Sequence, residues 1–125
     1  MKRSTLFRLA LLSVAVMTMQ SANAGSAVAN DGHGHTVYSK GQPTKAIAIR
    51  HALETAHSNG WADARIIAAS DVTGYCAIAV ASKGNGSVLG AVLGRPSRAD
   101  AERRAIEICL KGGGTDPKVR WEWHG

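Results

Sequence analysis

The sequence predicts a small α+β domain in which a mainly antiparallel sheet of about five strands carries two helices on one face. Three observations lead to this prediction: two similar segments that each combine a helix with a strand, a hairpin signal between them, and a length of only 125 residues. Hydrophobic residues make up 45% and charged residues 19% of the chain, which is typical of a folded protein and not of a disordered one.

The first 24 residues are typical of a secretory signal peptide. A basic start at Lys2 and Arg3 precedes an apolar run, Leu9–Met17, and the small residues Ala22 and Ala24 form the pattern that signal peptidase recognises. We therefore expect cleavage after Ala24 and an exported protein, either periplasmic or secreted. An uncleaved N-terminal helix is the alternative. The apolar run is too short to span a bilayer and no cysteine follows it, so no stable membrane anchor is expected.

Export changes the charge balance of the chain. The whole sequence has 15 Lys and Arg residues against 9 Asp and Glu residues, a formal charge of +6. Lys2, Arg3 and Arg8 belong to the signal segment and all nine acids lie beyond it, so the expected mature chain carries +3. Arginines after residue 97 are interspersed with acidic residues, which is typical of a solvated helix face. We expect no nucleic-acid partner.

An internal repeat organises the rest of the chain. Residues 41–66 match residues 94–119 at a constant offset of 53, with nine identical pairs that include Gly41/Gly94 and Pro43/Pro96. Similar helix starts would explain the prolines but not the other identities. We interpret the match as an internal duplication, with repeats over about 36–70 and 88–124.

Each repeat is predicted to contain one helix. Thr44 and Ser97 are suitable N-caps, and Gly60 and the glycines 112–114 end the two helices. Strands are predicted at 36–40, 64–70, 75–81, 88–93 and 118–123 from their β-branched and aromatic residues. Asn85-Gly86 indicates a tight hairpin between the third and fourth strands. A phosphate-binding loop is the alternative there, but its Gly-Lys-Ser/Thr ending is missing.

Residues 25–35 are predicted to form a mobile arm that contains Gly and His, followed by a single domain over 36–125. His33 and His35, with Asp31 nearby, are weak candidates for a transition-metal site through two imidazoles. A solvated linker is the alternative. The ligand set is incomplete, so we expect neither a metal nor another cofactor.

Cys76 and Cys109 are predicted to form a disulfide. Cys76, Ile78 and Val80 share one face of the third strand, and this larger aliphatic set is expected to face the helices. Cys109 lies on the sheet-facing stripe of the second helix, and an oxidising exported compartment favours pairing. Two unpaired buried thiols are the alternative. A catalytic thiol is not indicated, because the surrounding face is apolar.

The strand from Tyr75, the Gly-rich turn after it, and the segment from Pro96 to Cys109 together resemble the exported bacterial family called domain of unknown function 4189. The likeness covers Gly74 to about Trp121. Cys76 stands where the family usually has a small residue, and Lys118 stands where a cysteine often precedes the last strand's valine. A rewired disulfide between Cys76 and Cys109 would reconcile both departures. The resemblance implies fold and export, and no activity.

The last strand offers a possible recognition surface. Val119, Trp121 and Trp123 alternate with charged residues, so if the Trp side packs under the helices the charged side lies on the open face of the sheet. The candidate partner face consists of Tyr75, Arg120, Glu122 and His124. An ordinary solvated sheet face is the alternative, and a reversed register would expose both Trp side chains.

No catalytic constellation is present in the sequence. It contains no Gly-x-Ser-x-Gly or His-Glu-x-x-His motif, and His51 and His57 do not share a helix face. Asp71 and Tyr75 could act as acid and base, as in any polar turn. We therefore expect a small exported binding module, not an enzyme, whose partner is a protein or a cell-envelope component; an inhibitor- or immunity-like role is one form of this. The alternatives are a small exported enzyme with an unrecognised site and a metal-handling protein using His33 and His35.

Overall fold

The structure is a computed structural model that describes residues 23–125, so the predicted signal segment lies almost entirely outside the described residues. The chain forms two successive units with the same order of elements. The first consists of β1 (Gly25–Asn30), β2 (Thr36–Gln42), α2 (Lys45–Ser58) and β3 (Arg65–Ser70). The second consists of β4 (Tyr75–Lys83), β5 (Gly86–Arg95), α3 (Arg98–Lys111) and β6 (Thr115–His124).

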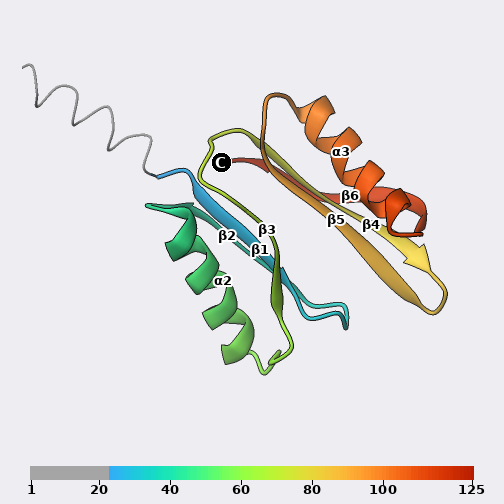
Figure 1. Ribbon diagram of the computed structural model, residues 1–125, viewed down its shortest axis with the longest axis horizontal. Coiled ribbons are helices and arrows are strands. Elements are labelled where there is room, and N and C mark those ends of the chain that lie inside the picture. The colour runs from blue at the N-terminus through green and yellow to red at the C-terminus, as the bar shows by residue number, and fades with distance from the viewer. Residues whose placement is uncertain (1–22) are drawn as a thin grey trace, which may run out of the picture.

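Each unit forms its own three-stranded antiparallel sheet. The strand order is β2-β1-β3 in the first sheet and β5-β4-β6 in the second, so the first strand of each unit lies in the middle. The two sheets lie face to face, with α2 outside the first sheet and α3 outside the second (Figure 1). The α+β class is confirmed. The expected single sheet of about five strands with both helices on one face is wrong, because each helix covers the sheet of its own unit.

The expected mobile arm over residues 25–35 is largely a core strand. Residues 25–30 form β1, and Ala27, Val28 and Ala29 are buried. Asp31 begins the loop that joins β1 to β2, and its carboxylate accepts hydrogen bonds from the amides of His33 and His35 at 2.8 and 3.0 Å. The segment consists mostly of Gly, Ser and Ala, residues with low strand propensity, and only its central position makes it a strand.

The two units share their strand register as well as their order. The middle strands pair at equivalent positions, with residue 28 opposite 38 and 68, and residue 78 opposite 91 and 121. A register shift follows Val28 in the first unit and Ile78 in the second. Both helices have 14 residues and begin at the predicted N-caps, Thr44 and Ser97. The two halves of the domain therefore share their order of elements and their strand register.

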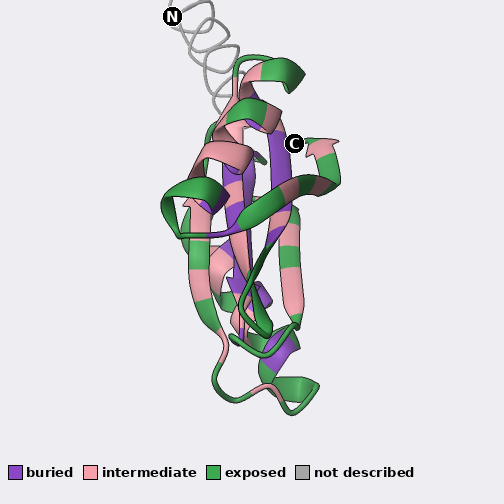
Figure 2. Cartoon of the chain, turned by 90° about the vertical axis from the view of Figure 1, so that its right-hand side faces the viewer, coloured by how far each residue is buried: buried purple, intermediate pink, exposed green. Residues whose placement is uncertain are grey.

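The helices pack on the small residues of the sheets. Ala77, Ala79 and Ala81 of β4 form one cluster with α3, and Ala27 and Ala29 of β1 do the same with α2. The expectation that Cys76, Ile78 and Val80 face the helix is therefore wrong. A helix backbone approaches a sheet closely only over small side chains, whereas larger ones fill the space between two sheets. Among the strands, the buried residues concentrate on the two middle strands, β1 and β4 (Figure 2).

This arrangement separates the two cysteines, and both are free. Cys109 lies in the cluster under α3, with its Sγ 3.3 Å from the carbonyl oxygen of Ala79. Cys76 alternates with Ala77 along β4 and therefore projects from the opposite face of the sheet. The predicted disulfide does not form because the strand lies between the two thiols. Burial raises the pKa of both thiols, so neither is activated as a thiolate.

We expect a reducing agent to leave the thermal stability of the folded protein unchanged, because no disulfide is available to be broken. Thermal melts with and without dithiothreitol should give the same Tm. Thiol titration after unfolding in denaturant without reductant should count two free thiols per chain. A count of zero, with a Tm that falls on reduction, would contradict the placement of the cysteines on opposite faces.

Candidate functional site

A small pocket lies where the start of β4, the first turn of α3 and the end of β6 meet. Its volume is about 60 Å³, and its lining residues are Tyr75, Cys76, Arg98, Glu122, Trp123 and His124. We call the polar side chains of this region, together with Glu102 of α3, the α3–β6 corner: Tyr75, Arg98, Glu102, Glu122 and His124. Three of the four residues of the predicted partner face are therefore brought together.

The pairing of β4 with β6 positions these side chains. Tyr75 lies opposite His124 and Ala77 opposite Glu122, so these residues project on the face that α3 covers. The predicted face is thus assembled beside the end of a helix and not on an open sheet. Arg120, its fourth member, is the extra residue between Val119 and Trp121 at the register shift. It is exposed and does not line the pocket.

The sequence predicts that Val119, Trp121 and Trp123 share one face of the last strand. The register shift instead places Val119 on one face of β6 and the two tryptophans on the other. Val119 packs toward α3, whereas Trp121 and Trp123 pair with inner-face residues of β4. The Trp123 ring stacks on Tyr38 of β2, with ring centroids 4.8 Å apart. Trp121 is 42% exposed. The tryptophans therefore lie on the inner side of the second sheet and not under α3, because the bulge at Arg120 changes the face on which side chains project.

Aromatic and charged groups both line the corner pocket. The rings of Tyr75 and His124 meet edge to face with centroids 4.7 Å apart. Arg98 Nε lies 4.0 Å from Glu122 Oε1, a distance that allows attraction but no hydrogen bond. The pKa of the Glu102 carboxyl is raised, because its protonated form can donate a hydrogen bond to Glu122, because it is partly buried, and because its ionised form would be repelled by the Glu122 carboxylate. Sequence reasoning missed Arg98 and Glu102, since they lie on another element and match no motif.

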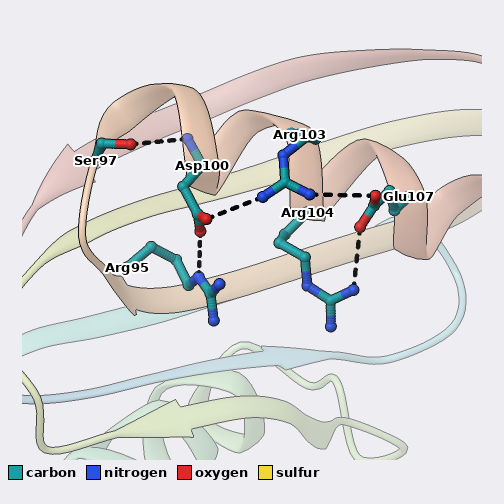
Figure 3. A network of polar contacts seen from close by, with 6 residues as sticks. All are labelled: Arg95, Ser97, Asp100, Arg103, Arg104 and Glu107. Carbon is teal, nitrogen blue, oxygen red and sulfur yellow. Dashed lines mark hydrogen bonds and ion pairs between the residues drawn. The ribbon is translucent and has the colours of Figure 1, made fainter.

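Other acidic residues of α3 are compensated by arginines (Figure 3). Asp100 contacts Arg95 Nε at 2.5 Å and Arg103 at 3.0 Å, and Glu107 contacts Arg103 at 3.4 Å and Arg104 at 3.1 Å. These hydrogen bonds outweigh partial desolvation and lower the pKa of both carboxyls. Arg95, Arg103 and Arg104 therefore already form ion pairs with neighbouring acids.

A second and more open hollow, of about 490 Å³, lies at the tip of the β1–β2 hairpin and includes Asp31, His33 and Asp63. The two candidate metal residues have different partners there. His35 Nδ1 lies 2.6 Å from Asp31 Oδ2 and its ring stacks on Trp61, whereas His33 Nε2 lies 3.7 Å from Asp63. Within residues 23–125, no three His, Cys, Asp or Glu side chains are grouped so that they could hold a metal ion.

The carboxylate of Asp31 is held in its charged form by this loop. Partial burial tends to raise its pKa, but hydrogen bonds from the His35 side chain and from the amides of His33 and His35 outweigh burial and lower the pKa to about 2. The ordinary value is 3.8, so ionised Asp31 stabilises the fold above about pH 4. This contribution disappears as the pH falls toward 2.

We expect Asp31→Ala to lower the free energy of unfolding at pH 7 and to flatten its decline between pH 4 and pH 2, because the variant lacks the carboxylate whose pKa differs between the folded and unfolded states. Urea unfolding at several pH values measures both effects. Asp63→Ala is the matched control, since its side chain is 79% exposed and lies 3.7 Å from its nearest basic group. Equal pH profiles for the two variants would contradict the role of Asp31.

Comparison with known proteins gives one match. A family model described as domain of unknown function (DUF4189) matches residues 24–123, which span both units and extend well beyond the segment whose motifs resembled that family. No curated protein and no solved structure matches the chain.

Proposed function

The chain belongs to the family described as domain of unknown function (DUF4189), and on this premise we propose that it is a small exported binding module without catalytic activity. Its partner in this proposal is a protein or a cell-envelope component, and an inhibitor- or immunity-like role is one form that such binding takes. The α3–β6 corner is the proposed contact region. The family description assigns no activity, so the proposal depends on the properties of the corner itself.

The size of the corner pocket carries the proposal. Pockets that enclose small-molecule substrates typically measure about 300–1,000 Å³. The corner pocket, at about 60 Å³, is too small for such a substrate but accommodates the tip of one side chain. Tyr75, Arg98 and His124 surround it, and Tyr and Arg are among the residue types that contribute most to binding at protein interfaces. At this corner, a surface that receives one anchoring side chain fits the contact region of a binding module better than a pocket that encloses a substrate.

Charge and composition support the remaining parts of the proposal. The N-terminal sequence pattern supports export, and neither helix in the described part of the chain is long and apolar enough to cross a membrane. Nucleic acid is a poor partner for this region, because Arg103 and Arg104 of α3 and Arg95 of β5 already contact Asp100 or Glu107.

We also propose that the two units arose by duplication of one β-β-α-β unit. The sequence match at an offset of 53, the common strand register and the coincident register shifts support this origin. Gly41 and Gly94, an identical pair in the sequence match, also adopt the same left-handed conformation, with φ of 69° and 66°. Convergence would have to reproduce each of these details separately.

We expect the protein purified from the exported fraction to begin at Gly25. Intact mass spectrometry under non-reducing conditions should show the loss of residues 1–24 and no loss of hydrogens from the cysteines. Cleavage at this point would leave β1 intact, because that strand begins at Gly25. A full-length mass for protein recovered from the exported fraction would contradict the signal-peptide assignment.

The binding proposal is tested by titrating the immobilised protein with fractionated periplasmic or extracellular extract. A saturable partner should bind the native protein, and Tyr75→Ala and His124→Ala should weaken the binding at least about tenfold. His51→Ala is the matched control, because His51 is exposed on α2 and lies outside the corner. The proposal fails if no saturable partner is recovered, or if the corner variants bind as tightly as the control.

A further inference from the structure

Both cysteines of the chain lie in the second unit, and the folded protein holds them as free thiols. Cys76 is 2% exposed and Cys109 is fully buried, so the fold shields both sulfurs from an oxidant in solution. Before folding, the same two thiols are open to solvent and lie 33 positions apart on a flexible chain, a separation at which the ends of a loop meet readily. The reactivity of the pair therefore depends on whether the chain has folded.

The native positions of the two thiols exclude a bond between them. Cys109 contacts β4 from the side of α3, with its Sγ 3.3 Å from the carbonyl oxygen of Ala79. Cys76 precedes Ala79 by three residues, which is roughly 10 Å along the strand, and projects from the opposite face of the sheet. A disulfide requires Cα atoms about 4.4–6.8 Å apart and Cβ atoms that point toward each other. The bond and the native arrangement of β4 and α3 therefore cannot coexist.

The packing under α3 also prevents the strand from turning to form the bond. If β4 turned so that Cys76 faced α3, Ile78 and Val80 would face α3 as well, because alternate side chains of a strand share a face. In the native layer β4 places only alanines under the helix, and a Cβ added at Gly90 of β5 would overlap the carbonyl oxygen of Ala105. This layer has no room for larger side chains, so a cross-linked chain must lose the packing of α3 on its sheet.

We propose that the second unit is a redox-sensitive folding switch: a disulfide between Cys76 and Cys109 that forms before folding holds the chain out of its native structure until a dithiol reductant opens it. The inference is independent of the proposed binding function, because it concerns how the native structure is reached. In the oxidising compartment expected for an exported chain, the order of folding and oxidation then decides whether native protein forms.

The cross-link requires a disulfide oxidant, of which oxidised glutathione is an example. The thiolate of one cysteine attacks a sulfur of oxidised glutathione, which forms a mixed disulfide and releases one glutathione thiolate. The thiolate of the other cysteine then attacks the protein sulfur of the mixed disulfide, which forms the bond between Cys76 and Cys109 and releases the second glutathione. The two cysteines together lose two electrons and two protons, and oxidised glutathione gains them. A dithiol such as dithiothreitol reduces the bond by the same exchange and is itself oxidised to a cyclic disulfide.

The test starts from the protein purified from the exported fraction and unfolded in urea. Incubation with oxidised glutathione should yield a monomer that has lost two hydrogens and carries no glutathione, as measured by intact mass spectrometry. After this species is isolated and the urea is removed, its near-UV circular dichroism signal should be at least about tenfold weaker than that of reduced protein refolded in the same way. Addition of dithiothreitol should then restore the signal of the reduced protein.

Two controls separate the effect of the bond from other effects of the oxidant. Folded protein exposed to oxidised glutathione without urea should form the bond at least about tenfold more slowly than unfolded protein. Cys76→Ala combined with Cys109→Ala cannot form the bond, so this variant should refold equally well with and without prior exposure to the oxidant. Because the oxidised and reduced forms of the native sequence are compared directly, the test does not depend on the stability of the double variant. A cross-linked monomer that regains the native signal without reductant, or an unfolded chain that forms no bond between its cysteines, would overturn the inference.

Discussion

Replacing Gly90 with alanine is expected to destabilise the protein by about 3 kcal/mol, a large part of the stability of a small domain. Gly90 lies in β5 directly under α3, and a Cβ at this position would lie 2.1 Å from the carbonyl oxygen of Ala105 and 3.1 Å from Cβ of Ile108. The first contact is with helix backbone, which cannot move aside as a side-chain end can. The helix must therefore lift from the sheet, and this would loosen the buried layer of Ala77, Ala79 and Cys109.

Chemical denaturation measures this effect, and a thermal melt should show Tm lower by roughly 10–20 °C. Gly86→Ala is the matched control in the same strand, because the nearest atom to its added Cβ is the carbonyl oxygen of Lys83 at 3.8 Å. The control should be neutral or slightly stabilising, since alanine restricts the unfolded chain more than glycine does. Similar stabilities for the two variants would show that α3 does not lie as close to β5 as the structure places it.

Truncation of Ile78 to alanine is the second large effect, with an expected loss of about 2–5 kcal/mol. Ile78 is fully buried in the middle strand of the second sheet and projects toward the first sheet. Removal of three side-chain carbons leaves a cavity between two sheets that are held apart by their other side chains. The space can therefore close only partly, which keeps the cost high.

Urea unfolding of Ile78→Ala should give a lower midpoint with an unchanged m-value, because the native fold is retained. Ile67→Ala in β3 makes the same chemical change at a side chain that is 42% exposed, and its cost should stay below about 1 kcal/mol. If Ile67→Ala proved as costly as Ile78→Ala, the layer between the sheets would not be the main core that the buried residues indicate.

Local sequence signals predicted much of the secondary structure. The caps Thr44 and Ser97 gave both helix starts, because capping depends on the residue and its immediate neighbours. The hairpin between β4 and β5 was also confirmed, although its turn residues are Gly84 and Asn85, and Gly84 has a φ of 59°. Both signals act over a few residues and need no knowledge of tertiary structure.

Features that depend on tertiary packing were not predicted. β1 has the composition of a linker, and Cys76, Ile78 and Val80 were assigned to the wrong face because a single sheet was assumed. With one sheet the larger residues have only the helices to pack on, whereas a second sheet offers them a thicker layer. The assignment of the two cysteines to one layer failed for the same reason.

The candidate site was predictable in part. The structure brings Tyr75, Glu122 and His124 together, because alternation along a strand holds locally at each end of β4 and β6, but on the face that α3 covers and not on the predicted open face. Arg120 was misplaced because a bulge inserts a residue without a clear sequence signal. Glu102 and Arg98 could be assigned to the site only from the structure. The sequence does not show which turn of α3 lies beside the end of β6.

The layer between the two sheets has a consequence for the cooperativity of folding. Each helix protects only the outer face of its own sheet, so Val28 and Ile78 are shielded from water only when both units are present. During synthesis, the first unit is complete at residue 70 but still exposes its inner face until residues 75–124 have formed the second sheet. We therefore expect neither unit to be stable alone and the domain to unfold in a single cooperative transition.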